Sequence, residues 1–256
     1  MNQTLQRLKD IEKNGYQLDF GNVFNDAFEN YKKIALYAGL VLIIFGILFT
    51  AIIAGFVIAA VGSSLISGGL NPEKLKVENF TESQMLIFNI SAIVISCIMS
   101  PFQASFLKMA LYGERDNEFR ISDLFSYYKL PYLTKIVGST LTISVIGLVQ
   151  ATLFSNIHFE LLGGIITYFI SFITILTVPL IIFGELDTFN AIKYSILIIF
   201  KQPIVILGLI IIAFIGSFVG IMGCCIGIFF TLPFIYSMNY VIYSSIVGID
   251  FQEEIQ

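Results

Sequence analysis

The chain has 256 residues, of which 57% are hydrophobic and only 12% charged, and its formal net charge is −4. Soluble domains carry about 25% charged residues, so a soluble protein of this length could not bury so much apolar surface, and we predict an all-α integral membrane protein covered by lipid. The sequence has no basic block typical of nucleic-acid binding, and its three cysteines and one histidine show no spacing typical of metal sites or disulfide frameworks.

Residues 1–18 are predicted to be a polar N-terminal leader. Leu5, Leu8 and Ile11 recur there at helical spacing, which favours at most a weak surface helix. Residues 20–33 follow with an apolar face of helical period, which predicts an amphipathic helix in the headgroup layer. Because the first apolar run comes late and is long, we expect no cleavable signal peptide.

Six apolar stretches of the chain are long enough to cross a bilayer, for which about 20 residues are needed. The predicted spans lie at about 34–61, 85–112, 132–155, 161–183, 203–221 and 225–249. The last two come from one uncharged run, which the glycine-containing turn at 220–223 divides. We therefore predict a single six-helix transmembrane domain over 19–249 and a short acidic tail, 250–256.

An internal repeat of three units is suggested by the order of these segments. Amphipathic segments precede the odd-numbered spans, at 20–31, 119–128 and 187–199. Each of these spans begins with an aromatic residue followed by lysine, a pair that suits the membrane interface. The predicted interfacial anchors are Tyr31, Lys32, Tyr128, Lys129, Phe200 and Lys201. The pattern predicts three hairpins, each preceded by a cytoplasmic amphipathic helix.

The lysine and arginine residues predict the orientation of the chain. With the N-terminus inside, only Lys74 and Lys76 of the 14 basic residues fall in predicted external segments. Cytoplasmic loops of membrane proteins carry such an excess of positive charge. We therefore predict that both termini are cytoplasmic and that all three amphipathic segments face the cytoplasm, where anionic lipid attracts their lysines.

The candidate functional residues are prolines and amides inside the spans. The candidates for a hinge or pathway are Pro101, Pro179, Pro233, Asn89, Gln103 and Asn239. A helix-interior proline frees the carbonyl four residues earlier, and broken helices mark binding sites in some transporters. The alternative is that the prolines shape the bundle, that the hydroxyls of Ser100, Thr177 and Thr231 take up the freed backbone groups, and that the amides join helices.

Three tyrosines, Tyr236, Tyr240 and Tyr243, share one face of the sixth predicted span. This arrangement is typical of an aromatic belt near the interface. The alternative is an aromatic-lined groove for an acyl chain or a lipid headgroup.

Short motifs of the chain resemble a large set of uncharacterised prokaryotic six-span proteins, which is related to the membrane domain ahead of some glycerophosphodiester phosphodiesterases. The motifs are Phe20-Gly21-Asn22-Val23-Phe24, Tyr31-Lys32-Lys33, Ile121-Ser122-Asp123-Leu124-Phe125, and Ala191 with Ser195 before Phe200-Lys201. The resemblance covers about 19–248 and implies a multi-pass protein of the bacterial cytoplasmic (inner) membrane. It carries over no active-site residue, and we expect no phosphodiesterase domain in the eight residues after Gly248.

The sequence predicts a non-enzymatic protein that binds or organises membrane components. Membrane lipids or a protein in the membrane are the expected partners, without nucleic acid, cofactor or metal. The sequence lacks the general acid, base and nucleophile that an intramembrane enzyme needs. No acidic residue or histidine falls at mid-depth in the predicted spans, which argues against a proton- or cation-coupled pump. The alternative function is a transporter or permease for a neutral or lipid-like solute, which a water-filled cavity beside Asn89, Gln103 or Asn239 would favour.

Overall fold

The computed structural model describes residues 3–68, 82–156, 159–222 and 226–249, and no strand occurs among them. The helices are α1 (Gln3–Asn14), α2 (Phe20–Gly68), α3 (Glu82–Glu114), the 3₁₀ helix η3 (Ile121–Tyr128), α4 (Tyr132–Asn156), α5 (Glu160–Ile173), α6 (Thr177–Ile182), α7 (Thr188–Lys201), α8 (Pro203–Phe218), the 3₁₀ helix η4 (Val219–Met222), α9 (Gly227–Thr231) and α10 (Pro233–Ile246). The prediction of an all-α chain is confirmed for these residues.

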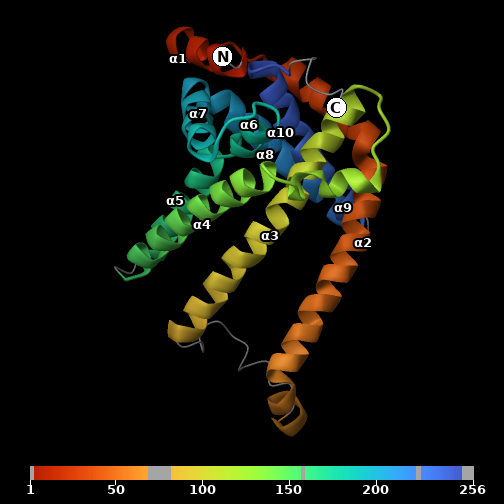
Figure 1. Ribbon diagram of the computed structural model, residues 1–256, viewed down its shortest axis with the longest axis vertical. Helices are drawn as coiled ribbons and strands as arrows, with labels where there is room; N and C mark the ends of the chain where they lie inside the picture. The colour runs from red at the N-terminus through yellow and green to blue at the C-terminus, as the bar shows by residue number, and fades with distance from the viewer. Residues whose placement is uncertain (1–2, 69–81, 157–158, 223–225, 250–256) are drawn as a thin grey trace.

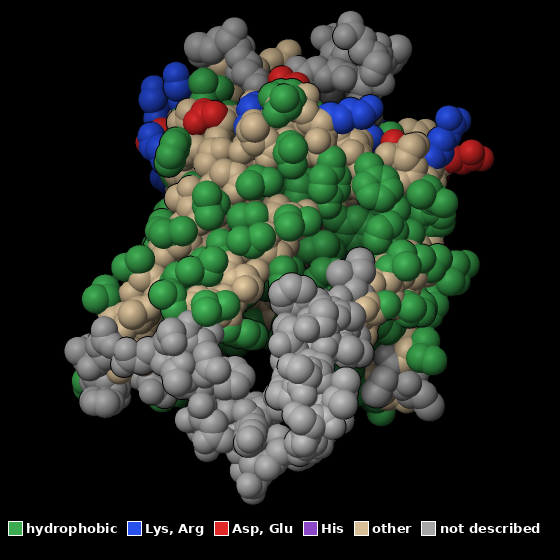
Figure 2. All heavy atoms as spheres, turned by 60° about the horizontal axis from the view of Figure 1, so that its bottom comes forward, with side chains coloured by type: hydrophobic (Ala, Val, Ile, Leu, Met, Phe, Trp, Pro, Cys, Tyr) green, Lys and Arg blue, Asp and Glu red, His purple; other side chains and the backbone are tan. Residues whose placement is uncertain are grey.

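Five helical segments of the described chain are long and apolar enough to cross a membrane. They are Phe20–Ala51, Met85–Glu114, Tyr132–Ser155, Leu161–Ile182 and Pro203–Met222. Figure 2 shows apolar side chains over the broad middle of the molecule and charged side chains along one edge. Helices satisfy their backbone hydrogen bonds internally, so surfaces of this kind are stable in lipid.

The apolar stretch predicted as a sixth span, 225–249, is divided. α9 ends at Thr231 and α10 begins at Pro233, with Leu232 between them still at helical angles. Proline is tolerated in the first turn of a helix because no intrahelical bond needs its missing donor. This stretch is therefore not among the five long helices, and residues 223–225 lie outside the described part of the chain.

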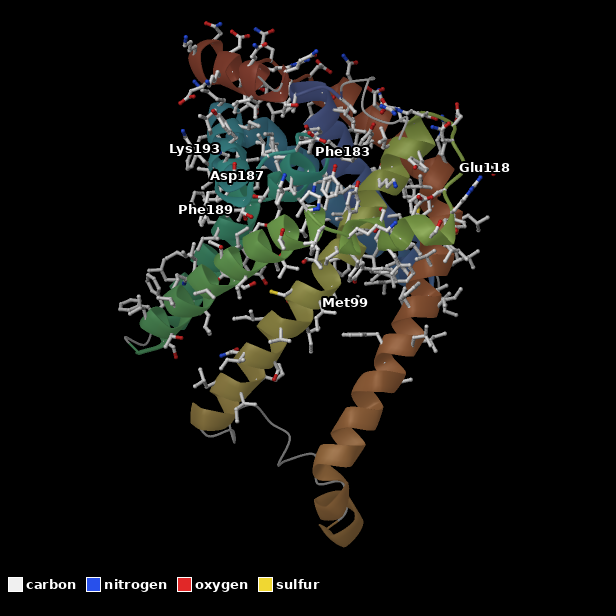
Figure 3. All side chains as sticks on the ribbon, viewed as in Figure 1. Met99, Glu118, Phe183, Asp187, Phe189 and Lys193 are labelled. Atoms are coloured by element: carbon white, nitrogen blue, oxygen red, sulfur yellow. The ribbon has the colours of Figure 1, made fainter. Side chains whose placement is uncertain are left out.

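The central helix of the molecule is α10, which packs against α2, α3, α6 and α8. Nine of its 14 residues are buried, and Tyr240 and Tyr243 are among the largest fully buried side chains. The ring of Phe183, just after α6, lies 5.6 Å from each of these two tyrosine rings (Figure 3). The aromatic-belt interpretation is therefore wrong for Tyr240 and Tyr243, because their rings fill the protein core.

The first predicted amphipathic helix, 20–31, is not a separate element. It forms the first turns of the continuous 49-residue helix α2, since no glycine or proline interrupts residues 22–38. Its inner face is buried at Val23, Ala27 and Asn30, so it packs against protein. Figure 1 shows α2 changing direction between its red first part and the orange remainder.

The other two predicted amphipathic segments are separate helices, as expected. η3 covers most of 119–128 with 3₁₀ geometry, and α7 covers 188–201. Each is divided from the next helix by one or more non-helical residues, at Lys129 and at Gln202. Pro203 occupies the first turn of α8, where its missing N–H donor is not needed.

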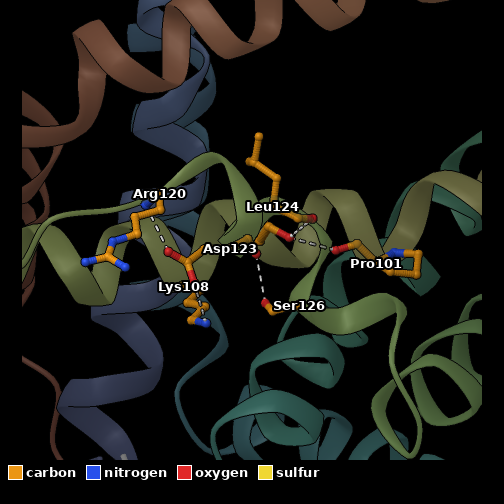
Figure 4. Close-up of polar contacts among 7 residues, drawn as sticks. Pro101, Lys108, Arg120, Asp123, Leu124 and Ser126 are labelled. Carbon is orange, nitrogen blue, oxygen red and sulfur yellow. Dashed lines mark hydrogen bonds and ion pairs between the residues drawn. The ribbon is translucent and has the colours of Figure 1, made fainter.

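The helix η3 is held against α3 by polar contacts (Figure 4). Ser105 of α3 donates a hydrogen bond of 2.7 Å to the carbonyl of Leu124. Lys108 forms a half-buried ion pair of 3.3 Å with Asp123, whose other oxygen accepts the backbone N–H of Arg120 at 2.9 Å. These bonds fix the start of η3, and its buried residues Leu124 and Tyr127 then face the bundle.

The predicted polar leader belongs to the folded body. Leu8 and Ile11 of α1 are buried, and α1 packs on α7. The Tyr16 hydroxyl donates to the carbonyl of Ile198 at 2.9 Å. Gln202 donates to the Tyr16 carbonyl at 2.6 Å and accepts the N–H of Leu18 at 3.2 Å. The first 18 residues are therefore tied to the α7–α8 junction over their described length.

Candidate functional site

The three candidate prolines are all buried, but they occupy different positions in their helices. Pro101 lies inside the continuous helix α3. Pro179 lies in the short helix α6, after an interruption at 174–176, and Pro233 begins α10 directly after Leu232, whose backbone is helical. The three prolines therefore differ in their helical context, since Pro101 alone lies in the interior of a long helix.

The carbonyls freed by two of these prolines are bonded by side chains. Four residues before Pro101, the Cys97 carbonyl accepts the Ser100 hydroxyl at 3.0 Å. Four residues before Pro179, the Ile175 carbonyl accepts the amide of Asn239 at 3.3 Å. The expected role of a neighbouring hydroxyl is thus confirmed for Ser100.

The other two hydroxyls behave differently from this expectation. Thr231 donates to the carbonyl of Ser217 on α8, which joins α9 to α8. In the part of the chain that the structure describes, the Thr177 hydroxyl and the Asn239 carbonyl oxygen are buried without a hydrogen-bond partner. Two buried polar atoms without a hydrogen-bond partner therefore lie at the contact between α6 and α10.

The interruption between α5 and α6 is closed by Ser195 of α7, a residue that sequence reasoning did not place in any site. The buried Ser195 hydroxyl accepts the N–H of Leu176 at 3.2 Å and donates to the carbonyl of Ile173 at 3.0 Å. One side chain thereby satisfies one group on each side of the break. An unsatisfied buried backbone group would be costly here.

Replacing Ser195 with alanine should lower the free energy of unfolding by about 1–3 kcal/mol, because both backbone groups lose their partner. Thermal unfolding of the purified protein in one detergent measures the change. The matched control is Ser171→Ala on α5, whose exposed hydroxyl bonds only within its own helix; it should change the stability by less than about 0.5 kcal/mol. Equal effects of the two substitutions would contradict the bridging role.

The two amides predicted on α3 are not brought into a polar site. Asn89 is half-buried and Gln103 is exposed. Gln150, on α4, instead joins two helices: its amide donates to the carbonyl of Gly163 at 2.9 Å and accepts the Thr167 hydroxyl at 2.9 Å. This is the expected role of an amide between membrane helices.

The predicted interfacial anchors have mixed surroundings. Tyr31 packs its ring on Phe234 at 5.3 Å, and Tyr128 donates to the carbonyl of Ile98 at 2.8 Å. Lys201 donates to the carbonyl of Glu12 in α1 at 2.8 Å. Lys32, Lys129 and Phe200 are exposed, as interfacial residues would be.

The start of α7 has the features of an interfacial helix. Figure 3 shows Asp187, Phe189 and Lys193 along its outer side. Asp187 caps the helix by accepting the backbone N–H of Asn190, and the hydrogen bond from the Asn190 side chain lowers the pKa of the Asp187 carboxyl. Phe189 is 74% exposed, which suits contact with lipid beside a charged edge.

A cavity of about 890 Å³ lies at the charged end of the bundle, where α1, α2, α10 and the end of α3 meet. Its lining carries three basic and three acidic side chains. These are Arg7, Lys33, Arg115, Asp26, Glu29 and Glu114. A second cavity of about 400 Å³ adjoins α1 and Gly248, and Arg7 lines both. Neither cavity is lined by the predicted prolines or amides.

Buried hydrogen bonds hold the helices around the larger cavity. Asn30 of α2 donates to the carbonyl of Ala110 in α3 at 2.7 Å. Ser237 of α10 lies 2.7 Å from the carbonyl of Ala27 and 2.8 Å from the Asn30 side-chain oxygen. Tyr240 donates to the carboxylate of Glu114. These bonds join α2, α3 and α10 at the cavity wall.

The sequence shows the charged residues of this cavity. It could not predict that they lie close together, because α1 and α10 are more than 200 residues apart in the chain. No group of three or more His, Cys, Asp and Glu residues that could hold a metal occurs in the described ranges. Comparisons with protein-family models, with curated proteins and with solved structures found no match. The chain's own geometry therefore carries the functional argument.

Proposed function

We propose that this chain is a multi-pass protein of the bacterial cytoplasmic membrane that binds or organises membrane components, lipids above all, without catalysing a reaction. The supporting observation is the continuity between the charged cavity and the exposed apolar helices. Helix α2 lines the cavity with Asp26, Glu29 and Lys33, and farther along it exposes Leu36, at 69%, and Ile47, at 65%. A ligand with a polar head and an apolar tail fits such a surface.

The proposal keeps six spans arranged as three hairpins, with both termini in the cytoplasm. The α9–α10 segment would be the sixth span, broken at Pro233 and shielded from lipid by α2 and α8. The excess of basic residues on one side of the predicted spans supports this orientation. The resemblance to the membrane domain ahead of some glycerophosphodiester phosphodiesterases belongs to the same proposal.

Transport of a neutral or lipid-like solute is the second candidate. The interruption between α5 and α6 favours it, since transporters build binding sites at broken helices. The unpartnered oxygens of Thr177 and Asn239 lie beside that break. On this alternative, replacing Pro179 with alanine should abolish solute flux while the protein still folds.

Extraction of the protein with its surrounding lipid, followed by exchange into detergent, tests the two candidates. On the binding proposal, mass spectrometry should find phospholipid or a partner protein that survives the exchange, and proteoliposomes should show no solute or lipid flux above protein-free vesicles. Loss of every bound component, together with a flux that Pro179→Ala removes, would favour transport instead.

A further inference from the structure

Two charges in the larger cavity have no partner in the part of the chain that the structure describes. Lys33 is paired with Asp116 at 2.7 Å, Glu29 with Lys32 at 2.6 Å, and the Glu114 carboxylate accepts the Tyr240 hydroxyl. Arg7 of α1 and Asp26 of α2 make no such contact, although both line the cavity. The cavity thus offers one free guanidinium and one free carboxylate.

An apolar stripe leads away from this cavity along α2. Lys33, Leu36, Leu40, Ile44 and Ile47 follow one another at spacings of three or four residues, which places them on one face of the helix. The four apolar members are 47–69% exposed. At 1.5 Å per residue the stripe extends about 21 Å from Lys33, enough to cross one leaflet of a hydrocarbon core about 30 Å thick.

We propose that the cavity binds the headgroup of a zwitterionic phospholipid, with the phosphate on Arg7 and the ammonium on Asp26, and that one acyl chain lies along the Leu36–Ile47 stripe. This inference rests on the proposed function and names its ligand. A guanidinium matches phosphate oxygens through two parallel hydrogen bonds, and a carboxylate attracts an ammonium group.

The balance of charge in the lining favours a zwitterion over an anionic lipid. The lining carries as many acidic as basic side chains, and a headgroup with only negative charge would leave the Asp26 carboxylate without a partner. The stripe favours a lipid over a soluble zwitterion of the same chemistry, because a headgroup alone would leave the apolar face of α2 unused.

The test reconstitutes the protein in vesicles of equimolar phosphatidylethanolamine and phosphatidylglycerol, re-extracts it, and measures the ratio of the two retained lipids. Wild type should enrich phosphatidylethanolamine. Asp26→Asn should lower that enrichment about threefold, the size expected for one exposed ion pair. Arg7→Gln should reduce retention of both lipids, and Arg7→Lys should restore part of it.

Glu118→Gln and Lys9→Gln are the matched controls, since both side chains are exposed and neither lines the cavity. They should leave the lipid ratio unchanged, and an unaltered elution profile shows that each variant folds. An unchanged lipid ratio in Asp26→Asn, together with unchanged total retention in Arg7→Gln, would overturn this inference but leave the proposed function standing. Retention of no lipid by the wild type would defeat this inference and the lipid-binding part of the proposed function.

Competition with free phosphoethanolamine distinguishes a lipid ligand from a soluble zwitterion with the same headgroup chemistry. On the lipid proposal, millimolar phosphoethanolamine should leave the retained phosphatidylethanolamine in place, because it lacks the acyl chain. Displacement of the lipid at that concentration would show that the cavity recognises the soluble compound, and the part of the proposal that concerns the apolar stripe would be wrong.

Discussion

Replacing Gly220 with valine should lower the free energy of unfolding by on the order of 3 kcal/mol. A Cβ atom at Gly220 would lie inside contact distance of the Gly227 backbone and of the Thr231 hydroxyl. Overlap with backbone cannot be relieved by a rotamer change, so η4 and α9 would have to move apart. Thermal unfolding in detergent, followed by loss of the monodisperse elution peak, measures the effect.

The control for Gly220 is Gly147→Ala in α4, where an added Cβ meets nothing within 4 Å. This substitution should be neutral or should stabilise the protein by up to about 1 kcal/mol, because alanine favours the helix. If Gly220→Val were tolerated as well as Gly147→Ala, the result would contradict the close contact between η4 and α9 at Gly220.

Replacing Leu8 with alanine should cost about 2–5 kcal/mol, the usual range for a fully buried leucine. Leu8 is 0% exposed and lies in α1, which packs on α7. The expected result is a lower melting temperature and faster proteolysis within the first 18 residues. Lys9→Ala, on the exposed side of the same helix, should change neither; similar behaviour of the two variants would mean that α1 is only a loose leader.

The long apolar helices could be predicted from the sequence because their signal is local. Pro203 marked the first turn of α8, and the uncharged runs marked the spans. The prediction of a separate helix at 20–31 was wrong for a related reason. An apolar face of helical period indicates a helix, but only a helix breaker indicates where the helix ends, and residues 22–38 contain none.

The features that depend on distant residues could not be predicted in this way. Pro179 frees the Ile175 carbonyl, but the bonds that stabilise the interruption at 174–176 come from Ser195 and Asn239 of other helices. Tyr240 has the pattern of an interfacial ring but is buried by α2, α3 and α8 around it. The cavity, likewise, exists only because α1 and α10 meet in space, which brings Arg7 close to Gly248.

The placement of the charged face at the cytoplasmic surface underlies both proposals, and cysteine labelling tests it most directly. Single cysteines would replace Lys9, Glu118 and Lys74 in a chain without its native cysteines, and intact spheroplasts would be treated with a membrane-impermeant maleimide. Position 74 should label at once, whereas positions 9 and 118 should label only after permeabilisation. Labelling of positions 9 and 118 in intact spheroplasts would contradict the cytoplasmic orientation and remove the cavity from the cytoplasmic leaflet.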